Sequence, residues 1–165
     1  MKNILMAAVA LTAMTAMPAM AQDQNSTFTV NGSVDAKCSA FTAGTFAING
    51  GTIATDSSGM LTSANTGTST PVAVWCNSAG AKINVSHTPL VNAAYTTDTA
   101  AFTKTINFVA KANVAGVEYA AGADRDLGVV SGDLTVTASN LTSGGLKPFA
   151  GAYQGTITVV LKPGA

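Results

Sequence analysis

Charged residues are scarce in this chain of 165 residues: Asp, Glu, Lys and Arg make up only 10%, and the formal net charge is zero. With no basic excess or basic run, the composition argues against a nucleic-acid partner. There is one histidine, His87, and there are two cysteines, Cys38 and Cys76. Zinc and copper sites need several such ligands, so no metal or other cofactor is expected. No Ser, Thr or Lys stands in a catalytic motif, so we do not expect an enzyme.

The first residues have the pattern of an export signal. Lys2 precedes an apolar run over residues 4–14, and the small residues Ala19 and Ala21 stand before a polar stretch. This is the organisation of a secretory signal peptide, and cleavage is expected after Ala21. We therefore expect residues 1–21 to be removed, and residues 22–165 to form one domain of a secreted protein.

The two cysteines are expected to pair. An exported protein meets an oxidising environment, in which Cys38 and Cys76 normally form a disulfide. The spacing does not fit a Cys-x-x-Cys redox site. A structural disulfide that closes a loop of this length stabilises a small core by about 4 kcal/mol.

Short segments of alternating apolar and polar residues follow, separated by turns rich in Gly, Asn and Ser. This alternation predicts half-buried β-strands. The predicted strands cover residues 26–37, 45–48, 71–76, 81–87, 105–112, 117–120, 133–139 and 151–162. The side chains expected in the core include Ile83, Val85, Ile106, Phe108, Leu134, Val136 and Ala138. We expect a hairpin turn at 49–51 and another at 77–80, the second joining its flanking strands.

The fold class that follows is all-β. Many short strands, no amphipathic helix and one disulfide favour an immunoglobulin-like β-sandwich, with a closed barrel as the alternative architecture. The clearest strand is the last, in which Tyr153, Ile157, Val159 and Leu161 share one face. Such a strand closes a sheet. Which segment pairs with it is the question that decides the function.

Three features together resemble a known family. An alternating segment, 30–38, enters Cys38; a second apolar segment, 72–76, ends at Cys76; and the closing strand has the form Gly-x-Tyr-x-x-x-Ile-x-Val from Gly151. In this order they resemble the secreted pilin subunits of chaperone–usher fimbriae, in the branch that contains the spore coat U domain and the archaic pili.

The resemblance implies an immunoglobulin-like sandwich that lacks its last strand and assembles by donor-strand exchange. A periplasmic chaperone first fills the resulting groove, and the N-terminal extension of the next subunit then replaces it, with an outer-membrane usher exporting the fibre. The extension would be about 22–33, with Phe28 and Val30 as donor residues. Tyr153, Ile157, Val159 and Leu161 would line the acceptor groove. The implied function is a structural subunit of a surface fimbrium with a role in adhesion and biofilm formation.

An alternative stays open. If the N-terminal strand folds into its own sheet, the chain is a self-complete secreted sandwich, such as a coat protein or a carbohydrate-binding module. Exposed aromatic residues would indicate the latter, and Trp75 and Tyr95 are the candidates.

Overall fold

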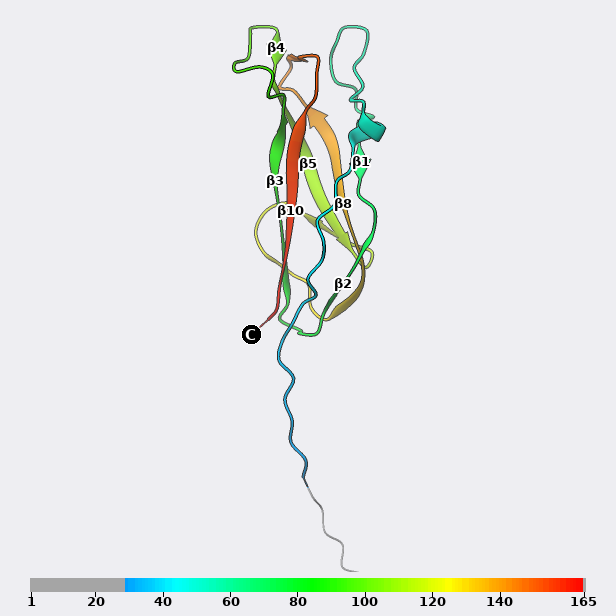
Figure 1. The fold of residues 1–165 in the computed structure, drawn as a ribbon, viewed down its shortest axis with the longest axis vertical. Coiled ribbons are helices and arrows are strands. Elements are labelled where there is room, and N and C mark those ends of the chain that lie inside the picture. Colours follow the sequence, from blue (N-terminus) through cyan, green and yellow to red (C-terminus); the bar gives the residue numbers. More distant parts are fainter. Residues whose placement is uncertain (1–28, 165) are drawn as a thin grey trace, which may run out of the picture. The chain divides into compact units, whose positions relative to one another are not determined.

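A computed structural model describes residues 29–164 of the chain (Figure 1). Two compact units are distinguished, Met1–Ser33 and Val34–Ala165. The predicted signal peptide lies outside the described residues, and so does Phe28. In the first unit, residues 29–33 have no regular secondary structure, and Val30 is 93% exposed.

The second unit is built almost entirely of β-strands, with no α-helix among residues 34–164. One 3₁₀ turn, η1, covers Ile48–Gly51. The longer strands are β2 (Val72–Cys76), β3 (Lys82–Val91), β5 (Thr105–Val114), β6 (Val117–Ala120), β8 (Val130–Thr142) and β10 (Gln154–Lys162). Short strands complete the set: β1 (Gly67–Thr68), β4 (Phe102–Thr103), β7 (Arg125–Asp126) and β9 (Lys147–Pro148).

The strands form two groups of antiparallel ladders. In one, β8 pairs with β1, β2 and β5, and β5 also pairs with β6. In the other, β3 pairs with β10 and β7. The two groups meet where Leu90 and Val91 of β3 pair with the start of β5. Among the strands of residues 29–164, only the short β4–β9 pair is parallel.

The core lies between these two groups of strands, because one cluster of buried side chains draws residues from both, and partly buried Leu90 of β3 and Ile157 of β10 pack against the other. One cluster combines Val74, Leu134 and Val114 of the first group with Ile83 and Val85 of β3. A second cluster is centred on the buried side chains of Ile48, Ile106, Phe108, Ala110, Ala138 and Leu141. Since apolar burial is the main favourable term in folding, this two-sided packing holds the ladders together.

The disulfide fixes the start of the second unit to the end of β2. Cys38 and Cys76 are bonded, and backbone hydrogen bonds flank them from Ser39 N to Trp75 O (2.8 Å) and from Asn77 N to Lys37 O (3.0 Å). The predicted disulfide is confirmed. Residues 37–39 are thus held along β2 by covalent and hydrogen bonds together.

Most strand predictions agree with the structure. Residues 71–76, 81–87, 105–112, 117–120, 133–139 and 151–162 correspond to β2, β3, β5, β6, β8 and β10. The predicted core residues Ile83, Val85, Ile106, Phe108, Leu134 and Ala138 are buried, and Val136 is partly buried. The alternation in these segments is strong because each contributes one face to the core.

Three expectations are wrong. Residues 29–37 form no strand, because only the last of them reach a hydrogen-bonding neighbour. Residues 45–48 run into η1 instead of a strand and hairpin, since Asn49 (φ 45°) and Gly50 (φ 70°) take left-handed backbone conformations. Finally, β2 and β3 are not a hairpin: β2 pairs with β8, so the turn at 77–80 carries the chain from one ladder group to the other.

Candidate functional site

Strand β10 lies at an edge of the sheet. It pairs with β3 along its length, and no other strand of residues 29–164 pairs with it. In an antiparallel ladder the backbone N–H and C=O groups of every second residue point away from the neighbour. Therefore β10 presents a row of free backbone donors and acceptors along its outer edge.

The inward side chains of β10 are less covered than those of the strand beside it. Leu161 pairs with Ile83, and Val159 pairs with Val85. The two β3 residues are 0% and 2% exposed, whereas their β10 partners are only half-buried. Directly paired residues point to the same face, so the difference shows that cover is missing on the β10 side.

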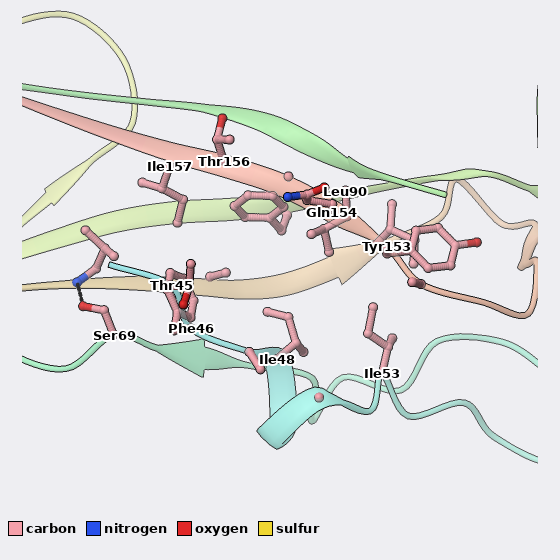
Figure 2. Close-up of a pocket in the computed structure, with 18 of the residues that line it drawn as sticks. Thr45, Phe46, Ile48, Ile53, Ser69, Leu90, Tyr153, Gln154, Thr156 and Ile157 are labelled. Carbon is pink, nitrogen blue, oxygen red and sulfur yellow. Dashed lines mark hydrogen bonds between the residues drawn. The ribbon is translucent and has the colours of Figure 1, made fainter. Parts of the chain in front are cut away.

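A groove of about 1200 Å³ runs along this uncovered side (Figure 2). Its floor is formed by core side chains, among them Ile106, Phe108 and Ala138. Figure 2 shows Ile157 and Tyr153 on one side of the groove, and Ile48 and Ile53 on the other. Only Lys147 among the lining residues carries a charge, so the groove suits an uncharged, largely apolar occupant.

The wall opposite β10 is an extended segment, residues 41–48, all of which line the groove. Phe41 and Phe46 are partly buried against the two core clusters. The structure records no hydrogen bond from the backbone of residues 40–46 to any other residue of 29–164; the next is Asn49 N to Thr66 O, 2.8 Å. Both walls of the groove therefore carry backbone N–H and C=O groups that have no partner within residues 29–164.

Buried Asn65 holds the loop that extends this wall. Its Oδ1 accepts hydrogen bonds from Asn49 Nδ2 (2.6 Å) and Ala54 N (2.7 Å), and its Nδ2 donates to Ala54 O (2.8 Å) and Thr62 O (2.9 Å). A fully satisfied buried amide fixes its surroundings strongly. In this way Asn65 keeps residues 49–62 in place, including Ile53 at the groove.

Tyr153 anchors the entry to β10. Its hydroxyl shares its proton between the backbone oxygens of Thr103 (3.0 Å) and Phe149 (3.1 Å). Burial raises the pKa of this phenol above its ordinary value of 10.0, so it stays a neutral donor. The ring meanwhile lines the groove.

The structure places the predicted groove residues as follows. Tyr153, Ile157 and Val159 line the groove. Leu161 instead packs against the core cluster that contains Ile83, and it is not among the lining residues. Of the two predicted donor residues, Val30 lies in the first unit, and Phe28 lies outside the described residues.

Sequence reasoning expected a strand over 45–48 but did not identify these residues, or Phe41 and Ile53, as a wall of the groove. Phe41, Phe46, Ile48 and Ile53 line the groove, but residues 42–45 are small or polar and show no alternation. The available signal was the apolar residues on either side of them, Ala40 and Phe41 before and Phe46, Ala47 and Ile48 after.

Other chemistry is sparse in the part of the chain that the structure describes. No group of three or more His, Cys, Asp or Glu side chains is placed to hold a metal ion between residues 29 and 164. The His87 ring packs on Phe108 with 4.7 Å between ring centroids. Over the same range, no helix has the length and apolar character needed to span a bilayer.

Comparison of the chain with models of protein families, with curated proteins and with solved structures gives no match. The groove is therefore interpreted from its own geometry.

Proposed function

We propose that this protein is a structural subunit of a chaperone–usher type pilus or related surface fibre, which assembles by donation of a β-strand from one copy to the next. One observation carries the proposal: the groove is apolar inside and has unpaired backbone on both walls, on β10 and on residues 40–46. An inserted strand satisfies both sets of backbone groups and covers the core at once.

The architecture supports an immunoglobulin-like sandwich that lacks one strand. In such sandwiches a tyrosine at the start of a late strand bonds to the backbone a few residues upstream. Tyr153 stands in that relation to Phe149, and β10 follows it. The missing strand would then occupy the space between β10 and residues 40–46.

The donor is the N-terminal extension, about 22–33, of another copy. It alternates apolar and polar residues at Phe28, Thr29 and Val30, which is the pattern that a strand needs to face a groove on one side only. Fully burying side chains such as Phe28 and Val30 contributes about 1.5–3 kcal/mol each. Exposed edges invite uncontrolled pairing, so a periplasmic chaperone is the expected first occupant, and an outer-membrane usher the expected exporter.

The proposal implies a secreted protein at the cell surface, with roles in adhesion and biofilm formation. It involves no catalysis, cofactor, metal or nucleic acid. Its partners are other copies or related subunits.

The test is disulfide trapping in the full mature chain from Gln22. A cysteine replaces Val30, and a second replaces Ile157 or Val159 in separate variants. Neighbouring strands place side chains of one face close enough for a disulfide. Strand donation predicts a ladder of covalent multimers on a non-reducing gel after mild oxidation.

The matched control pairs V30C with V160C. Val160 is on the same strand, but it points to the outer face and is 42% exposed, so no ladder is expected. If V30C forms an intramolecular disulfide with the groove cysteine instead, the N-terminal strand pairs within its own chain. The protein is then a self-complete sandwich, and the fibre proposal is wrong.

A further inference from the structure

Aromatic side chains are exposed at one end of the second unit. Tyr95 and Phe102 both stack on Phe149, with ring centroids 3.9 Å and 5.5 Å from it. Phe149 is partly buried, whereas Tyr95 is 37% exposed and Phe102 is 39% exposed. Strand β4, which carries Phe102, lies at the end of the unit opposite the C-terminus (Figure 1). We call this end, with residues 92–104 and 147–149, the loop end.

Hydrogen bonds hold the loop end in its shape. Asp98 Oδ1 accepts from Lys104 N (2.7 Å), and Lys104 Nζ donates to Thr96 O. A backbone bond from Lys147 N to Ala101 O (3.0 Å) ties the two chain segments together. The exposed rings are therefore presented on a fixed surface, and little ordering is needed when a partner covers them.

The chain enters the second unit at the opposite end. Asn77 Nδ2 donates to Asp35 O (3.0 Å), and Asn77 Oδ1 accepts from Lys37 N (2.6 Å), so the first residues of the unit are fixed to the turn after β2. The C-terminal residues lie on the same turn, because a Cβ atom at Gly164 would be 2.6 Å from Gly80 Cα. We call this end the entry end.

Apolar side chains are exposed at the entry end too. Val34, the first residue of the unit, is 87% exposed. Val129 is 69% exposed, and it precedes Val130, which pairs with Cys76 at the end of β2. Each end of the unit thus leaves apolar surface in water, and contact between the two ends would bury it.

Strand donation brings the entry end of one copy close to the groove of the next. The donor segment is about 22–33, so only Val34 separates it from Asp35, which is fixed to its own subunit. Two steps of extended chain span only about 7 Å. The entry end of the donor copy must therefore lie beside the mouth of the groove that its extension fills.

The mouth at the loop end is the one that fits. Strand β10 (Gln154–Lys162) is the longer and more regular wall of the groove, and it starts at the loop end. A donor that pairs with β10 in the antiparallel sense, which is the more stable one, leaves the groove where β10 begins. The groove lining reaches Phe102 and Phe149 there.

We propose that the entry end of one copy packs on the loop end of the next, so that Val34 and Val129 of the donor copy cover Tyr95 and Phe102 of the acceptor. This inference rests on the proposed strand donation and adds a second contact, outside the groove, between the same two copies. The donated strand brings the two ends together. The contact between the ends then limits how far one subunit swings about the short connection.

The test is cross-linking between two variants of the full mature chain, V34C and Y95C. The two are refolded together and treated with a short bis-maleimide, and Y95C carries a C-terminal affinity tag, so that the mixed dimer has its own mass. Tyr95 does not line the groove, so its replacement leaves the groove intact. We expect a mixed dimer that joins the two cysteines.

The matched control replaces Y95C with a tagged V109C. Val109 is 39% exposed, close to the value for Tyr95, but it lies in the middle of β5, where it pairs with Ser139. This pair should give no more mixed dimer than it gives in urea, where only collisions between unfolded chains join the cysteines. As much mixed dimer with V109C as with Y95C would overturn the proposal.

The ladder expected for V30C with I157C separates the two proposals. A ladder without a mixed dimer of V34C and Y95C leaves strand donation standing and overturns the contact between the ends. Absence of both products overturns both proposals.

A second measurement does not depend on cross-linking. Y95S removes an exposed ring, and we expect it to weaken association by roughly tenfold in sedimentation velocity. V109S removes a side chain of similar exposure from the side of the unit and should leave association unchanged. Thermal unfolding checks that both variants are folded. Association of folded Y95S as tight as that of the wild type would overturn the proposal.

Discussion

The hydroxyl of Tyr153 lies 3.1 Å from the backbone oxygen of Phe149, four residues before it in the chain, and donates its proton there and to Thr103. This one group connects the start of β10 to the loop of β9 and to the strand β4. It joins the edge of the groove to the two segments that carry Phe102 and Phe149, whose rings stack on each other.

Replacing Tyr153 with phenylalanine should lower the free energy of unfolding by about 1–2 kcal/mol, because two partly buried carbonyl oxygens lose their donor. Urea denaturation of the mature chain measures this. The ring stays in place, so the slope of the denaturation curve should not change. A variant as stable as the wild type would show that water replaces the hydroxyl without loss.

A carboxylate in the groove should block assembly. Val159 lines the groove and Val160 faces the opposite side of the same strand. In V159D the new charge stays hydrated in the free chain but is buried when a donor strand enters, which costs about 3 kcal/mol, or roughly 100-fold in affinity. Sedimentation velocity after refolding measures the association. V160D is the control, and equal loss in both variants would contradict the role of the groove.

Acid should loosen the contact between Asp124 and the end of β10. A hydrogen bond from Lys162 Nζ, 2.6 Å from Oδ2, holds the pKa of Asp124 below its ordinary value of 3.8. A lowered pKa in the folded state means that the stabilisation is complete above pH 3.8 and is lost as the pH falls through the folded-state pKa.

Thermal unfolding of wild type and D124N between pH 7 and pH 2 checks this, since the wild type should be the more stable at pH 7 and the two should converge in the acid range. A constant difference across this range would rule out titration of Asp124 as the cause. The pair is exposed, so the difference at pH 7 should be small.

Removing the disulfide should destabilise the chain and disturb the groove together. Cys38 and Cys76 are 38 residues apart in the sequence. In the chain-entropy model, opening this loop lowers the free energy of unfolding by about 4 kcal/mol. In the double variant C38S/C76S, residues 37–39 keep only hydrogen bonds to β2. We expect a lower unfolding midpoint, and faster hydrogen exchange than in the wild type at the amides of Ser39 and Asn77, which bond across the disulfide. Unchanged exchange at these two amides would show that Phe41 and Phe46 hold the segment in place unaided.

The sequence allows prediction of a strand wherever one face of it is covered by the core. In β3, β5 and β8, Ile83, Ile106 and Leu134 alternate with polar residues because each packs between the two ladder groups. The same reasoning located β10. It failed for residues 41–48, because an extended segment without hydrogen-bonded neighbours is under little pressure to alternate, and Thr42 and Gly44 face open space.

Pairing was harder to predict than strands. The hairpin expected between β2 and β3 assumed that neighbours in sequence pair, yet Trp75 pairs with Ser131, far along the chain. The stacking of the Tyr95 and Phe102 rings on Phe149 could not be predicted from the sequence for the same reason. Tyr95 stood out as an aromatic residue in a loop, but nothing local indicates that Phe102 and Phe149 come to lie against it.

The disulfide also determines how the second unit responds to mechanical force. Tension applied at residue 37 passes through Cys38 directly into β2, so the residues between the two cysteines are shielded from the load. Fully extended, 38 residues measure roughly 130 Å. While the disulfide is intact this length is not available for extension, so a subunit of the proposed fibre would stay short under shear. Reduction would release the length, and the chain would then extend under load.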